Sequence, residues 1–82
     1  EETLIDYFKI FPNPSSGFVF IEQGTNRKLN VNIFSLTGQS IKSFLVTEKK
    51  NYLNIDNIKN GIYLIQIKDE QELIQTKKLI IK

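Results

Sequence analysis

The stretch LNVNIFSLTGQSIKSFLV, residues 29–46, decides the fold. Leu29, Val31 and Ile33 alternate with asparagines, which is the pattern of a strand with one buried and one solvated face. Gly38 then lies in a tight turn, where glycine tolerates a positive φ, and a second apolar segment returns after it. The stretch therefore predicts a β-hairpin with Gly38 in its turn.

Apolar residues also recur at every second position on both sides of this hairpin. Most apolar positions hold isoleucine, valine, leucine, phenylalanine or tyrosine, which favour strands. Further strands are predicted at residues 5–11, 18–22, 53–55, 63–67 and 73–82, with loops or turns that include residues 24–26, 47–51, 56–61 and 69–72. No helix is expected. Seven short strands, with a turn about every ten residues, predict an all-β, seven-stranded antiparallel immunoglobulin-like β-sandwich, with a small barrel as the alternative.

The alternation also predicts which side chains are buried. Val19 and Ile21 are expected in the core from the second strand, and Leu79 and Ile81 from the last. In the first strand, Phe8 and Ile10 share one face, while Ile5, Tyr7 and Phe11 share the other. Ile58 is expected to lie under the loop between the fifth and sixth strands.

Length and composition limit the function. The 82 residues fit a single domain, residues 1–82, in which residues 1–6 are a linker or a lead-in to the first strand. A domain of this size buries only about 60% of its unfolded surface. The chain has no cysteine and no histidine, so it lacks thiolate chemistry, disulfides, and the commonest general base and zinc ligand.

Charge and hydropathy exclude further classes. The formal net charge is only +2, and the basic residues are scattered pairs that we interpret as solvated surface, so no nucleic-acid partner is expected. No apolar run approaches the roughly 18 residues of a membrane span, so we expect no direct membrane insertion. The sequence shows no initiator methionine and no secretory signal, and we expect it to be part of a longer protein.

No catalytic or metal site is predicted. The acidic residues fall mostly on loops or strand ends, and nothing pairs two of them across a cleft. Asp56, Asn57 and Asn60 could be considered as calcium ligands, but an Asx-rich turn explains them better than a dedicated calcium loop. We therefore expect no metal and no cofactor.

Three motifs stand out by their order. Pro12, Asn13 and Pro14 form a rigid turn, named here the PNP turn, after the first strand. Gly61 and Tyr63 form a G-x-Y at the start of the sixth strand, where glycine is expected to serve the turn and the tyrosine hydroxyl to lie at the rim of the core. The chain finishes in KLIIK, where Lys78 and Lys82 lie four apart, on one face of a strand and opposite Leu79 and Ile81.

In this order and spacing, the sequence resembles the C-terminal sorting domains of the type IX secretion system, type A, found on secreted proteins of Bacteroidota. The resemblance covers the chain from about Tyr7 to Lys82. It includes the PNP turn, the hairpin VNIFSLTGQSI, the segment LNIDNIKNGIYLIQI and the terminal K-x-x-x-K. Ser35 and Phe11 depart from the residues that the family often has.

The resemblance implies a role in export. A cargo protein would precede this domain, cross the inner membrane by an ordinary signal, fold in the periplasm and be recognised by type IX components, namely an outer-membrane shuttle or translocon. A sortase-like protease would then remove the domain, with cleavage expected near residues 1–4. The resemblance thus implies a secreted or cell-surface location and no enzymatic activity.

Candidate recognition residues follow from the motifs and from the resemblance. The PNP turn, Gly61 and Tyr63 are expected to act mainly through shape, whereas Lys78 and Lys82 are equally explained as a signal or as protection of an edge strand. A separate apolar patch for a shuttle or receptor is predicted from the aromatic residues Phe11, Phe18 and Phe20.

A binding module is the alternative from a different class. A carbohydrate-binding sandwich could use Tyr7, Tyr52 or Tyr63 as stacking platforms. A plain structural spacer is a third possibility.

Overall fold

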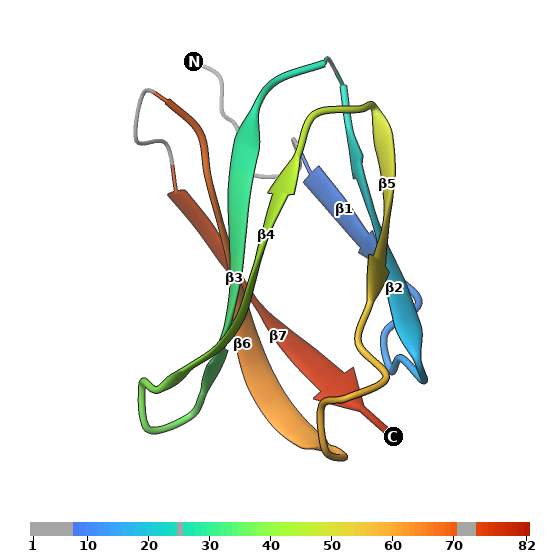
Figure 1. Cartoon of the computed structure of the whole chain (residues 1–82), viewed down its shortest axis with the longest axis vertical. Helices are drawn as coiled ribbons and strands as arrows, with labels where there is room; N and C mark the ends of the chain where they lie inside the picture. The colour runs from blue at the N-terminus through green and yellow to red at the C-terminus, as the bar shows by residue number, and fades with distance from the viewer. Residues whose placement is uncertain (1–7, 25, 71–73) are drawn as a thin grey trace.

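A computed structural model describes residues 8–24, 26–70 and 74–82, and these residues form strands and connecting loops only. Figure 1 shows the strands in chain order. They are β1 (Phe8–Phe11), β2 (Phe18–Gln23), β3 (Leu29–Ser35), β4 (Ser40–Val46), β5 (Lys50–Asn54), β6 (Gly61–Lys68) and β7 (Ile74–Ile81).

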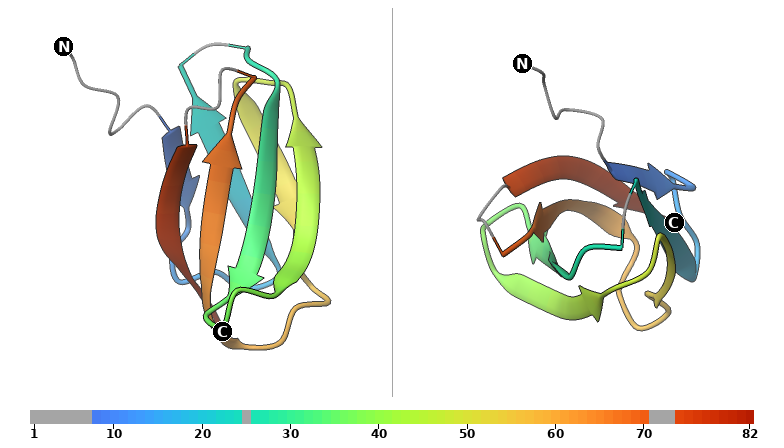
Figure 2. Two further views of the ribbon diagram at one scale, coloured as in Figure 1. Left: turned by 90° about the vertical axis from the view of Figure 1, so that its left-hand side faces the viewer. Right: turned by 90° about the horizontal axis from the view of Figure 1, so that it is seen from above.

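The strands form two layers. One sheet has the order β1-β2-β5, the other has the order β4-β3-β6-β7, and all pairings between neighbouring strands are antiparallel. Figure 2 shows the two sheets facing each other in edge view. The prediction of an all-β fold with seven antiparallel strands is therefore confirmed, and the described residues form two separate sheets rather than one closed barrel.

The core lies between the inner faces of the sheets. Val19, Ile21, Leu79, Ile81 and Ile58 are all buried, as their alternation and loop position predicted. Phe8 is buried and Ile10 packs against the same cluster, in agreement with the predicted face of the first strand. The remaining buried apolar residues are Leu29, Val31, Ile33, Val46, Leu53, Ile55, Ile65 and Ile67.

The β3–β4 hairpin has the predicted turn. Gly38 has a φ of 94°, and its N–H donates to the carbonyl of Ser35 at 3.0 Å. The N–H of Ser35 donates to the carbonyl of Gln39 at 2.9 Å, which closes the turn. The register shifts between Ile33 and Phe34, so the hairpin contains an irregularity that its alternation did not reveal.

The fifth strand was predicted wrongly at its start. Residues 47–51 were assigned to a loop, yet β5 already begins at Lys50. Asn51 is only 8% exposed. Its amide donates to the carbonyl of Glu48 at 2.7 Å and accepts from the Glu48 N–H at 3.1 Å. A polar residue can lie inside the sheet here because its side chain satisfies the backbone of the preceding turn.

Candidate recognition surfaces

The PNP turn ends β1, as predicted, because Pro12 has no N–H for the next rung of the ladder. Both of its X-Pro bonds, Phe11–Pro12 and Asn13–Pro14, are cis. Pro12, Asn13 and Pro14 are all exposed, whereas the Ser15 that follows is buried. The Ser15 hydroxyl donates back to the carbonyl of Pro12, which fixes the shape of the turn.

The turn is bonded to the last strand, an arrangement that the sequence did not reveal. The Asn13 side chain donates to the carbonyl of Lys78 at 2.8 Å and accepts from the N–H of Ile80 at 3.0 Å. The next bonds are between main chains: the Ser15 N–H donates to Ile80 at 2.7 Å, and the Lys82 N–H donates to Ser15 at 2.8 Å. The PNP turn and the terminal lysine motif therefore meet in space.

The terminal strand has the predicted faces. Leu79 and Ile81 are buried in the core, while Lys78 and Lys82 are exposed. The two lysines therefore lie on the outer face of the four-stranded sheet, on either side of Ile80 in the alternation.

Apolar side chains adjoin these lysines. Ile80 is half-buried and pairs across the sheet with Ile62, which is 47% exposed. Lys78 pairs with Leu64, which in turn pairs with Phe34 of β3. Directly opposed residues on one face of a sheet are neighbours. The lysines therefore adjoin an apolar strip, which is formed by Ile80, Ile62, Leu64 and Phe34.

Gly61 opens the sixth strand, as the G-x-Y motif predicted, but it belongs to the strand and not to the turn that was predicted at residues 56–61. It is the first residue of β6 and pairs with Ile81. A Cβ at this position would meet the ring of Tyr63 at 3.4 Å, which is an ordinary van der Waals contact. Tyr63 packs against the core and its hydroxyl donates to the carbonyl of Lys59 at 2.6 Å, as a rim position implies.

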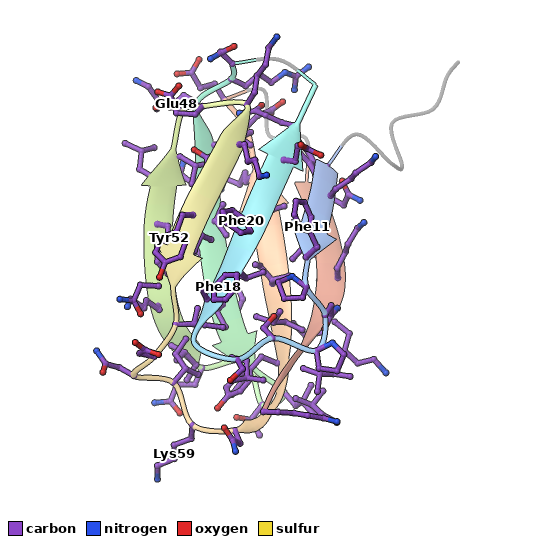
Figure 3. The ribbon with its side chains drawn as sticks, turned by 90° about the vertical axis from the view of Figure 1, so that its right-hand side faces the viewer. Phe11, Phe18, Phe20, Glu48, Tyr52 and Lys59 are labelled. Atoms are coloured by element: carbon purple, nitrogen blue, oxygen red, sulfur yellow. The ribbon has the colours of Figure 1, made fainter. Side chains whose placement is uncertain are left out.

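The predicted aromatic residues do come together. Figure 3 shows Phe11, Phe18 and Phe20 on the outer face of the three-stranded sheet, together with Tyr52. Ring centroids are 5.6 Å apart for Phe11 and Phe20, 5.5 Å for Phe18 and Phe20, and 5.8 Å for Phe18 and Tyr52. The ammonium of Lys50 lies 4.9 Å from the centroid of the Phe20 ring, within cation–π range.

Tyr52 is the member of this aromatic cluster (Phe11, Phe18, Phe20 and Tyr52) that the predicted patch lacked. It lies directly opposite Phe20 in the β2–β5 register and is 60% exposed, whereas the three phenylalanines are half-buried. Tyr52 is a neighbour of Phe20 because β5 pairs with β2. Predicting Tyr52 as part of the patch would therefore have required knowing which strand lies beside β2.

All the basic pairs were predicted to be solvated surface, but Arg27 and Lys77 make specific contacts within the protein. The Arg27 guanidinium lies 2.5 Å from a carboxylate oxygen of Asp69, whose side chain is only 5% exposed. The Lys77 ammonium donates to the carbonyl of Phe8 at 3.3 Å, and so joins β7 to β1. Both residues connect elements that are distant in the sequence.

In the part of the chain that the structure describes, no three acidic residues gather where a metal ion could be held. The N–H of Asp56 donates to the side-chain oxygen of Asn54 at 2.9 Å, in an Asx turn. Among the described residues, no helix is long and apolar enough to cross a membrane.

Comparison with known proteins gives a family match. Residues 9–82 match the family described as the secretion system C-terminal sorting domain. The endo-acting ulvan lyase of Formosa agariphila is 36% identical to this chain over 75 residues. That alignment covers 90% of this chain but 14% of the lyase, so the chain spans about one seventh of its relative's length.

Proposed function

This chain belongs to the family of secretion system C-terminal sorting domains, and we propose how its surfaces serve that function. The family match over residues 9–82 carries the assignment. As a type IX sorting domain, the chain is a signal that directs export across the outer membrane, to the cell surface or the medium. Such a domain implies a type IX machinery and a cargo that precedes it in the parent chain.

The finer steps are our proposal. An outer-membrane shuttle and the translocon recognise the domain, and a sortase-like protease removes it by cleavage in or before residues 1–4. The domain acts as a ligand and a protease substrate, not as a catalyst. It uses no cofactor and no metal, and residues 1–82 act as one unit.

We assign the sandwich to the immunoglobulin-like class. The strand orders β1-β2-β5 and β4-β3-β6-β7 support this assignment. So does Tyr63, near the start of the sixth strand, whose hydroxyl donates to a carbonyl four residues upstream. This is the pattern of a tyrosine corner in immunoglobulin-like domains.

Lys78 and Lys82 are proposed as the primary contact with the export machinery. Both ammonium groups are exposed on one face and adjoin the apolar strip through Ile80 and Ile62. Such a surface fits a partner that offers carboxylates around an apolar contact.

The aromatic cluster is proposed as a second contact surface. Its rings are partly exposed on the opposite sheet, and Tyr52 is the most accessible of them. Aromatic residues are over-represented at protein interfaces because they bury large areas at low entropic cost.

Carbohydrate binding remains the second candidate because Tyr52 is 60% exposed beside Phe18. Tyr63 is a poor platform, since its hydroxyl is bonded to Lys59 and its ring packs against the core. Tyr7, the other tyrosine considered, lies outside the described residues.

The test is an export assay. Residues 1–82 are fused to the C-terminus of a periplasmic fluorescent protein in a host with a type IX system. We expect the intact fusion outside the cell, reduced export for Lys78→Gln with Lys82→Gln, and normal export for the matched control Lys49→Gln with Lys59→Gln, whose lysines are also exposed. A folded, intact fusion that stays in the periplasm would contradict the sorting function and lead to a glycan-binding screen.

The same assay tests the aromatic cluster. Phe18→Ser with Phe20→Ser is compared with Leu36→Ser with Leu45→Ser, because both leucines are 62% exposed on the other sheet or its turn. Reduced export of the first pair alone, with folding intact by circular dichroism, supports the cluster as a contact surface. Equal export of the two double variants would exclude the aromatic cluster as a contact surface.

A further inference from the structure

The free edge of β7 is occupied where the terminal lysines lie. β7 is the last strand of its sheet and pairs on one side with β6. An edge strand presents unpaired N–H and C=O groups on its other side. In β7 and the residue after it, four of these groups have partners from one short segment: the carbonyls of Lys78 and Ile80, and the N–H groups of Ile80 and Lys82.

Asparagine suits this position for a chemical reason. The two prolines of the PNP turn have no N–H, so their main chain cannot donate to the strand edge. The Asn13 side chain carries one carbonyl oxygen and one NH₂ group, like a peptide unit, and it bonds to β7 with both. Ser15, the next residue with a main-chain N–H, continues the same edge with its own N–H and C=O. An isolated parallel bridge between Ser15 and Ile81 records this continuation.

We propose that Asn13 is a positioning residue for the C-terminal signal: its amide substitutes for a neighbouring strand and holds residues 78–82 extended, with Lys78 and Lys82 outward. This inference rests on the sorting function proposed above. Because the edge is occupied, a partner cannot read this segment by adding a strand to it. Recognition of the segment is therefore through the outward side chains, namely the two lysines and Ile80.

The first measurement is amide hydrogen exchange. Asn13→Ala removes the acceptor of the Ile80 N–H, and we expect exchange at Ile80 to rise on the order of tenfold, with protection at Ile65 in β6 unchanged. Asn13→Asp keeps that acceptor but loses the donor to Lys78, so Ile80 stays more protected than in the alanine variant. Asn57→Ala is the matched control, because Asn57 is exposed in a loop. Unchanged exchange at Ile80 in Asn13→Ala would overturn the proposed contact.

The second measurement is export of the fluorescent fusion by the same variants. We expect Asn13→Ala to reduce export severalfold and Asn57→Ala to leave it unchanged. Ile65→Val provides the stability control, because it weakens the core without touching the strand edge. Equal loss of export in Ile65→Val and Asn13→Ala would reduce the effect to stability and overturn the positioning role.

The outcomes separate this inference from the function on which it rests. Normal export by Asn13→Ala, with the Ile80 amide exposed to exchange, would overturn the positioning role and leave the sorting function intact. Retention of the unmodified, folded fusion would overturn the sorting function itself.

Discussion

Replacing Tyr63 with phenylalanine removes one hydrogen bond, from β6 to the loop that connects β5 and β6. The hydroxyl donates to the carbonyl of Lys59 at 2.6 Å, and the ring, which packs against the core and over Gly61, is retained. A neutral hydrogen bond contributes about 0.5–1.5 kcal/mol net. Because the Lys59 carbonyl is near solvent and water can replace the hydroxyl, we expect a loss of about 1 kcal/mol in the free energy of unfolding. In a domain of 60–100 residues this lowers the melting temperature by about 4–8 °C.

Thermal and urea unfolding, followed by circular dichroism, measure this loss. Tyr52→Phe is the control, since Tyr52 is 60% exposed and its substitution is expected to change stability by less than about 0.5 kcal/mol. The urea m-value is expected to stay constant, because the ring stays in place. If Tyr63→Phe melts at the wild-type temperature, the hydroxyl does not stabilise the loop before β6, and the tyrosine-corner interpretation loses its energetic basis.

Three further predictions concern stability and are checked by the same unfolding measurements. Gly17→Ala is expected to destabilise the domain more than Gly38→Ala. Both glycines have a positive φ, at 82° and 94°, but a Cβ at Gly17 would also lie 2.8 Å from the Asp56 side chain, whereas a Cβ at Gly38 would lie in open space. Equal losses of stability would contradict this reasoning. Ile65→Ala, at a fully buried position, costs about 2–5 kcal/mol, and a loss under 1 kcal/mol would place the residue outside the core. Arg27→Gln destabilises more than a typical surface substitution, by over about 0.5 kcal/mol, because its carboxylate partner is buried; a neutral result would make the ion pair dispensable.

Local patterns predicted the strands because each strand reports its own faces. In β3, Leu29, Val31 and Ile33 alternate with asparagines, and these three side chains are fully buried. The same alternation did not predict that Asn51 is a buried residue of β5. A buried asparagine looks like a loop residue in the sequence, and its place in β5 depends on a side-chain bond to Glu48 that only the folded turn provides.

The sequence proposes residues for the candidate site, but it does not predict the contacts between them. Asn13 and Lys78 were both selected from the sequence, yet they are 65 positions apart and meet only because the turn after β1 lies against the edge of β7. Tyr52 joins Phe20 for a similar reason, since β5 is the neighbour of β2 across the sheet. Alternation specifies which way a side chain points, whereas strand order specifies what it meets.

The order of the family's motifs has a physical explanation in this fold. The PNP turn near the start of the chain and the lysines at its end are each weak signals, but together they form one bonded unit through Asn13 and Ser15. Deleting residues 78–82 would also remove Leu79 and Ile81 from the core, so loss of export after such a truncation cannot distinguish a missing signal from a missing fold. An unfolded chain carries both motifs but not the contact between them. A receptor that reads the outward lysines on an extended strand therefore also selects for a folded domain.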